Sequence, residues 1–89
     1  MTLVVMGTVM EIEKQKVADL ICQILEIEEE LTDAAEFSAD YGADSLRTIE
    51  ILGALEREFG VEIPQEDLAR MKSLSTVLEV LEEACARHA

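Results

Sequence analysis

The sequence predicts an all-α fold, a small bundle of three longer helices and one short helix. Three segments carry apolar residues at steps of three and four, which is typical of amphipathic helices. No segment alternates for long enough to form a sheet. Only 3% of the residues are aromatic within a hydrophobic fraction of 49%, so the helices should pack through aliphatic stripes. A length of 89 residues accommodates one domain with a small core.

The first predicted helix covers residues 11–25. Charged and amide side chains occupy one side, and the other side carries the apolar residues Val17, Leu20, Ile21, Ile24 and Leu25. Residues 1–9 precede this pattern, and we expect them to form a flexible N-terminal extension of a domain over residues 10–89. The apolar run at the start of the chain is far shorter than the roughly 20 residues of a membrane-spanning helix. It also lacks the basic start of a secretory signal.

An acidic segment over residues 26–44 follows the first helix. Its apolar residues fit neither a helical nor an alternating period, and they are Ile27, Leu31, Phe37 and Tyr41. We interpret the segment as a long loop that these side chains anchor to the core. Such a length indicates a function or a hidden short element. The carboxylates lack the order that an EF-hand requires, so we predict no metal site from Asp33, Glu36, Asp40 and Asp44.

The second long helix is predicted to begin around Asp44 and to end at Phe59, with Gly60 as a left-handed cap. Helical geometry assigns one group of residues to the buried side, namely Ile49, Ile51, Leu52, Leu55 and Phe59. A second row at steps of four, three and four should face water, and it consists of Leu46, Glu50, Gly53 and Arg57. Leu46 is therefore expected to be exposed beside Ser45.

Two further elements complete the predicted bundle. Val61 and Ile63 lie in a short extended stretch, and Pro64 begins a short helix that reaches Met71. The last long helix opens near Ser73 or Ser75, with an apolar stripe of Leu74, Val77, Leu78, Leu81, Ala84 and Cys85. We expect His88 to be exposed to solvent in the C-terminal tail.

The chain is strongly acidic, with 20 acidic residues, seven basic residues and a formal net charge of −13. This charge repels nucleic acids and anionic membrane surfaces, so we expect protein partners that present basic patches. We expect the protein to be a monomer. Cys22 and Cys85 are too few and too far apart for a disulfide framework. We interpret them as packing residues of a protein in the reducing cytoplasm.

Ser45 stands between an acidic, glycine-containing turn and the second long helix. Ser45 is compatible with an ordinary helix cap. It is also compatible with a phosphorylation site, although no feature of the sequence specifically supports one. A hydrolytic nucleophile requires a neighbouring general base and an oxyanion hole. His88 is the single histidine and no GxSxG elbow is present, so we predict that the protein is not an enzyme. A fourth interpretation is that another enzyme modifies Ser45.

The segment over residues 40–64 supports this last interpretation, because it resembles the acyl carrier protein family. The family signature is a D-x-G-A-D-S-L turn that leads into an acidic helix and then into FGVxIP; here the chain reads DYGADSL and ALEREFGVEIP. The resemblance extends from about Met10 to Glu83. It implies that Ser45 receives a 4′-phosphopantetheine group from coenzyme A through a separate phosphopantetheinyl transferase. The terminal thiol of that group then carries acyl groups as thioesters between partners such as ketosynthases, acyltransferases or ligases.

The resemblance also implies roles for residues around Ser45. Gly42 leaves the approach to the hydroxyl open, and Asp44 and Leu46 contribute to recognition by the transferase. The surface that meets partner enzymes is expected to comprise Asp40, Leu46, Arg47, Glu50, Gly53, Glu56 and Arg57. Exposed ion pairs typically contribute about 0.2–1 kcal/mol each, so we expect weak and reversible docking.

Four positions depart from the housekeeping fatty-acid carriers of the family. Arg47 and Arg57 replace acidic residues, Gly53 replaces a larger apolar residue, and Tyr41 replaces leucine. Our hypothesis is a dedicated carrier of a specialised pathway such as polyketide assembly, with neutral drift as the alternative. A housekeeping carrier, an aminoacyl or peptidyl carrier and a non-covalent acidic interaction module remain open. Asp44 disfavours the aminoacyl type, which commonly has histidine before the serine.

Overall fold

The computed structural model describes the backbone of residues 2–88 and the side chains of residues 14–87. It contains three long helices, α1 (Thr2–Leu25), α3 (Ser45–Phe59) and α4 (Leu74–His88). Two short elements lie between them, the helix α2 (Phe37–Tyr41) and the 3-10 helix η1 (Gln65–Arg70). Residues 2–88 include no strand, so the predicted all-α class is confirmed. No helix in this part of the chain is long and apolar enough to span a membrane.

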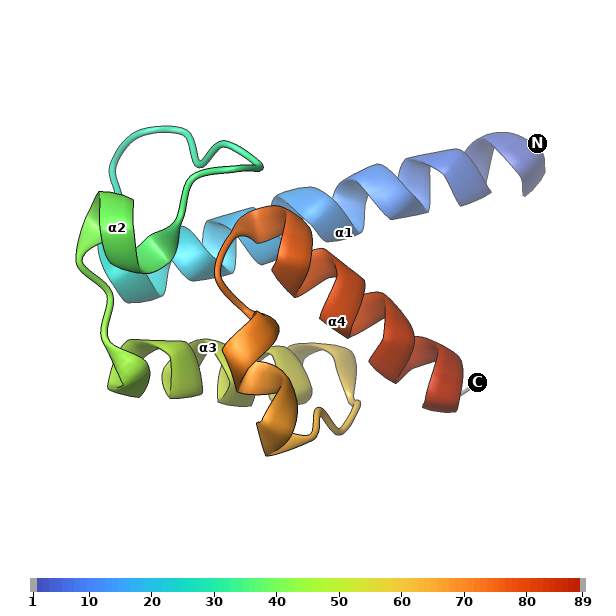
Figure 1. The fold of residues 1–89 in the computed structure, drawn as a ribbon. Helices are drawn as coiled ribbons and strands as arrows, with labels where there is room; N and C mark the ends of the chain where they lie inside the picture. The colour runs from blue at the N-terminus through green and yellow to red at the C-terminus, as the bar shows by residue number, and fades with distance from the viewer. Residues whose placement is uncertain (1, 89) are drawn as a thin grey trace.

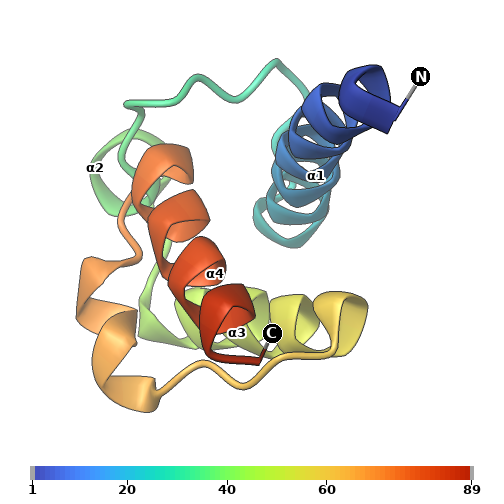
Figure 2. The ribbon, with the colours of Figure 1, turned by 90° about the vertical axis from the view of Figure 1, so that its right-hand side faces the viewer.

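The long helices enclose the core from three sides. In Figure 1, α1 lies along the top and α3 along the bottom, and α4 crosses between them. Helix α1 packs against both α3 and α4, and η1 packs against α3 and α4 on the other side. Figure 2 shows the same arrangement along α1, with the acidic loop bridging from α1 to α2.

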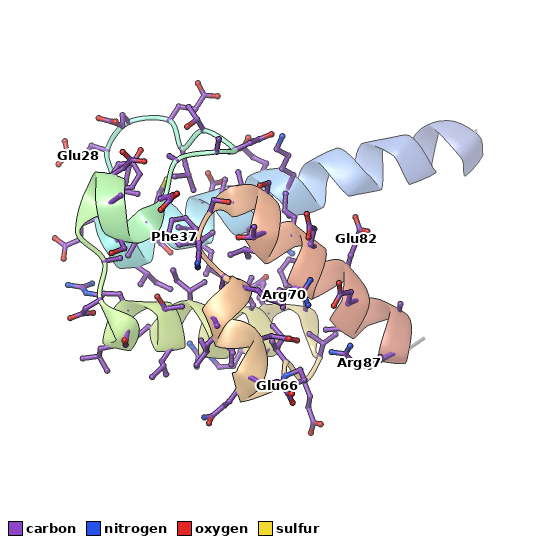
Figure 3. The ribbon with its side chains drawn as sticks, in the orientation of Figure 1. Glu28, Phe37, Glu66, Arg70, Glu82 and Arg87 are labelled. Atoms are coloured by element: carbon purple, nitrogen blue, oxygen red, sulfur yellow. The ribbon has the colours of Figure 1, made fainter. Side chains whose placement is uncertain are left out.

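Buried aliphatic side chains from every long helix form a single core. The acidic loop contributes Leu31 and α2 contributes Phe37, which is the largest fully buried side chain and lies in the interior between α2 and α4 (Figure 3). The other buried apolar residues are Val17, Ile21, Ile51, Leu52, Leu55, Val61, Ile63, Met71, Leu74, Val77, Val80, Leu81 and Ala84. The prediction that the loop is anchored by its apolar residues is confirmed, with Ile27 and Tyr41 packed partly against the core.

Helix α2 is the short element hidden in the acidic loop. The Phe37 backbone N–H donates to the Lys72 carbonyl at 2.9 Å, and the Ser75 N–H donates to the Asp33 carbonyl at 3.2 Å. These two bonds fasten the loop and α2 to the start of α4. Ser73 precedes that helix, as predicted, and its backbone N–H donates to Thr76 Oγ1 at 2.9 Å.

The short helix η1 is fastened to α4 by an ion pair. Both terminal nitrogens of Arg70 donate to the Glu83 carboxylate, each at 2.8 Å, and Figure 3 shows Arg70 beside α4. This bidentate hydrogen bond lowers the pKa of the Glu83 carboxyl below its usual value. The predicted short helix after Pro64 is thus confirmed, and it is held at a fixed place on α4.

The predicted burial was wrong at several positions, including Phe59, which is only partly buried. Ile49 is 46% exposed, because it precedes the fully buried Ile51 by two residues and helical geometry turns it roughly 160° away. Val80 is fully buried but was missed, whereas Leu78 and Cys85 of the predicted stripe are only partly buried. The stripe of α4 is therefore centred on Val77, Val80 and Ala84. The expectation for the His88 side chain lies outside the described residues.

The predicted start of the first helix was also wrong. Helix α1 begins at Thr2 rather than at Glu11, and Figure 1 shows that its first turns extend beyond the other helices. The sequence has no amphipathic pattern over those turns, so the apolar periodicity alone could not predict that they are helical. The flexibility of residues 1–9 stays a prediction.

Amide hydrogen exchange tests this prediction. We expect the amides of residues 5–9 to exchange roughly tenfold or more faster than those of residues 17–21, because Val17 and Ile21 are fully buried and local opening there must break core contacts. The packed half of α1 serves as the internal control within one spectrum. Equal protection over both halves would contradict a flexible extension.

Candidate site of covalent attachment

The turn before Ser45 depends on the conformation of Gly42. This residue ends α2 with φ of +67°, and its N–H donates to the Ser38 carbonyl at 3.0 Å. A side chain at Gly42 would meet nothing within 4 Å, so the glycine is required by its positive φ and not by lack of space. The sharp reversal directs the chain from α2 into α3.

Asp44 caps the helix that Ser45 opens. Its backbone is extended, and its Oδ1 accepts a hydrogen bond from the Arg47 backbone N–H at 3.0 Å. The carboxylate therefore satisfies a free donor at the positive end of α3. The capping function that was open for Ser45 is performed by Asp44. The helix ends at Gly60 with φ of +64°, as predicted.

The Ser45 side chain is exposed, and its hydroxyl forms no hydrogen bond with the other side chains and backbone groups that the structure describes. A hollow of about 670 Å³ lies beside it between α2, α3 and η1. The residues around this hollow include Phe37, Thr48, Leu68, Met71 and Lys72, and none of these is a histidine. The hydroxyl is therefore accessible, and the side chains around this hollow include no imidazole that could act as its general base.

Carboxylates dominate the electrostatics of the site. Asp40 and Asp44 flank the turn, and Oδ2 of Asp40 accepts from the Glu36 backbone N–H at 2.7 Å. Among the described residues, no three histidine, cysteine, aspartate or glutamate side chains lie close enough to hold a metal ion. What this arrangement offers is a free hydroxyl in an acidic surface.

Four of the predicted docking residues share the outer face of α3. Leu46 is 66% exposed, Glu50 and Arg57 are exposed, and Gly53 lies between them. The structure does not bring Glu56 into this row, because its Oε2 accepts from the Ile63 backbone N–H at 2.8 Å. The Asp40 carboxylate is likewise engaged within its own segment, because it accepts the hydrogen bond from the Glu36 backbone N–H at the start of α2.

Arg47 has a structural role that sequence reasoning missed. Its Nη1 donates to the Ile24 carbonyl in the last turn of α1, and its Nη2 lies 3.6 Å from a Glu26 carboxylate oxygen. A cation at the C-terminal end of a helix satisfies a free carbonyl and the helix dipole. The start of α3 is thereby tied to the end of α1. Arg47 Nε also lies 3.9 Å from a Glu50 carboxylate oxygen. The i,i+3 spacing of that pair can be read from the sequence, whereas the contacts with α1 cannot.

We expect Arg47→Gln to lower the free energy of unfolding by about 1.5 kcal/mol, the lower end of the range for a hydrogen bond to a charged group. The matched control is Arg57→Gln, which removes the same charge from the same helix and should stay within about 0.5 kcal/mol of the wild type. Urea denaturation followed by circular dichroism measures both. Equal stability of the two variants would contradict the tether.

Comparison with known proteins identifies the chain. Residues 15–82 match the model of the family described as phosphopantetheine attachment site. The chain is also 49% identical over 72 residues to the polyketide-8 synthase acyl carrier protein 1 of Streptomyces avermitilis, covering 80% of this chain and 86% of that protein. The chain belongs to the acyl carrier protein family. The acyl carrier protein resemblance in the sequence is thus confirmed.

Solved structures agree with the fold of this acyl carrier protein. A candidate acyl carrier protein from Mycobacterium tuberculosis superposes with a TM-score of 0.73 at 24% identity, over 79% of this chain and 95% of the other. The acetyl actinorhodin acyl carrier protein from Streptomyces coelicolor gives a TM-score of 0.58 at 28% identity, over 81% of this chain and 93% of the other. The protein is an acyl carrier, and phosphopantetheine is its covalent cofactor.

Proposed function

We propose that this acyl carrier protein serves polyketide biosynthesis and that Ser45 is the residue to which phosphopantetheine is attached. The observation that supports the site most directly is the exposed Ser45 hydroxyl, which has no hydrogen-bond partner in the described part of the chain. The pathway is supported by the identity to a Streptomyces carrier that is named as part of a polyketide synthase.

The attachment step uses Ser45 as a nucleophile that its partner activates. Ser45 Oγ forms a bond to the phosphorus next to pantetheine in coenzyme A, and the bond from that phosphorus to the bridging oxygen breaks. Adenosine 3′,5′-bisphosphate leaves, and the hydroxyl proton passes to a base of the transferase. Asp44 keeps the start of α3 in helical form, so that the hydroxyl stays at the surface. The carrier itself performs no catalysis.

Once attached, phosphopantetheine supplies a terminal thiol that holds acyl groups as thioesters. This chain contributes the surface on which partner enzymes recognise it. Leu46 offers an apolar contact, Glu50 with its acidic neighbours attracts basic surfaces, and Arg57 disfavours partners built for an entirely acidic helix. The partners are a phosphopantetheinyl transferase, a ketosynthase and an acyltransferase or ligase. They meet the monomeric carrier in the cytoplasm.

The experiment is intact mass measurement after incubation of the protein with coenzyme A and a promiscuous phosphopantetheinyl transferase. We expect a gain of one phosphopantetheine, located by fragmentation on the peptide that contains Ser45. Reductant is included because a thiol could attach to cysteine through a disulfide. Burial, followed by the charge of Asp19, raises the pKa of the Cys22 thiol and so opposes that side reaction. A folded sample without any gain would indicate a non-covalent interaction module.

A further inference from the structure

Four residues form a line along α3 from the attachment residue. Ser45, Ile49, Gly53 and Arg57 follow one another at steps of four, so each is the neighbour of the next on adjacent turns, and the line winds about 120° around the helix from Ser45 to Arg57. Ser45 and Arg57 are thereby separated by about 18 Å along the helix axis, which is comparable with the length of an extended phosphopantetheine chain. Ile49 was predicted to be buried but is exposed, so an apolar side chain lies next to Ser45 on this line.

The line borders a groove between α1 and α3. The groove has a volume of about 550 Å³ and lies over Ile49, Gly53 and Arg57, with Leu20, Gln23 and Ile24 as its opposite wall. It lies on the α1 side of α3, whereas the hollow lined by Ser45 and Lys72 lies on the η1 side. Ser45 therefore stands between two possible resting places for a flexible arm.

Gly53 keeps the floor of the groove open. It lies in the middle of α3, where glycine is less favourable than alanine. Packing does not require it, since an added Cβ would meet only the Arg57 Nη1, at an ordinary contact distance of 3.9 Å. Glycine at such a position is expected where a ligand approaches the backbone closely.

Arg57 gives the groove an uncompensated positive charge. Its guanidinium forms no ion pair or hydrogen bond with the side chains of residues 14–87. The two carboxylates of the groove are already compensated, Glu58 by Lys16 at 3.2 Å and Glu50 by Arg47 at 3.9 Å. Arg57 is thus a cation of the groove that no carboxylate in the described part of the chain engages, which leaves its guanidinium available to an anionic ligand.

We propose that the groove holds the loaded arm along α3 and that Arg57 binds the free carboxylate of a dicarboxylic acyl group, such as malonyl. The proposal rests on Ser45 as the attachment residue, and what it adds is that Arg57 positions the loaded arm. A planar guanidinium pairs with a carboxylate through two parallel hydrogen bonds. Ile49 contacts the apolar part of the arm, and Gly53 admits the chain between Ile49 and Arg57. An acetyl group lacks the carboxylate and is not held at Arg57.

The test compares malonyl and acetyl forms of the protein, prepared with a promiscuous transferase from malonyl-coenzyme A and acetyl-coenzyme A. Intact mass first establishes that each form is loaded. Nuclear magnetic resonance at neutral pH then records the Arg57 Nε–H signal and the amide signals of Gly53 and Ala54. We expect these signals to differ between the malonyl and acetyl forms of the wild type. The difference should disappear in about 1 M salt, where the Debye length falls to about 3 Å.

Two matched variants locate the charge. Arg57→Gln should abolish the difference at Gly53 and Ala54, whereas Lys72→Gln, which removes a cation on the other side of Ser45, should leave it intact. Identical groove signals in the malonyl and acetyl wild type would overturn the proposal. So would a malonyl-dependent difference confined to Leu68, Ala69 and Lys72, which would place the cargo in the hollow beside η1. Absence of any mass gain would instead overturn the attachment at Ser45.

Discussion

Ser45→Ala is expected to abolish loading by phosphopantetheinyl transferase completely. The substitution removes the one atom that forms the bond to phosphorus and leaves everything else of the site in place. Because Asp44 and not Ser45 caps α3, the helix retains its first hydrogen bond in the variant. An exposed side chain without a hydrogen bond in the described part of the chain contributes little to folding, so stability should change by less than about 0.5 kcal/mol.

The chain offers matched controls for this variant. Ser38 and Ser75 are exposed serines in α2 and α4, and Ser38→Ala and Ser75→Ala should load as the wild type does. Intact mass gives the loaded fraction, and circular dichroism verifies that each variant is folded. A mass gain in folded Ser45→Ala would place the attachment on another residue.

Phe37→Ala is expected to lower the free energy of unfolding by about 3–5 kcal/mol, the range for truncation of a buried aromatic side chain. Phe37 is 1% exposed and is the largest fully buried side chain of the core. Small domains have total stabilities of roughly 5–15 kcal/mol, so this change removes a large share. In a domain of this size each kcal/mol lowers Tm by roughly 4–8 °C, which gives a decrease of at least about 12 °C.

Phe59→Ala is the matched control, since it makes the same chemical change at the end of α3. Phe59 is only partly buried, and its ring is contacted from outside by Lys16 at 5.7 Å. The expected decrease in Tm is therefore clearly smaller than for Phe37→Ala. Thermal denaturation followed by circular dichroism compares the two, and equal decreases would show that the acidic loop is not anchored through Phe37.

Features with a local cause were predictable from the sequence. The capping aspartate before Ser45 and the left-handed glycine after Phe59 fix the ends of α3 through bonds within a few residues. The family motif likewise lies in one continuous stretch, so the candidate attachment residue was found without a structure. The three long helices followed from periodic apolar residues, because each buries one stripe.

Features that depend on contacts between distant segments were not predictable. Arg47 was assigned to partner docking, but it donates to the Ile24 carbonyl, 23 residues earlier in the chain. No spacing rule relates the start of one helix to the last turn of another. The groove beside Gly53 has the same origin, because its walls come from α1 and α3. The sequence shows that Gly53 lies in the middle of a helix, but it does not show that this position faces α1.

The fastening of the segments on both sides of Ser45 has a consequence for the kinetics of exchange between partners. Helix α2 is bound to the start of α4 through the Phe37 amide, and α3 is bound to α1 through Arg47. The platform that presents Ser45 is therefore preorganised, and a partner that docks on it has little carrier backbone to order. Encounter and dissociation should consequently set the rate of hand-over, with long-range charge governing the former. A shuttle built in this way changes partners by diffusion and not by refolding.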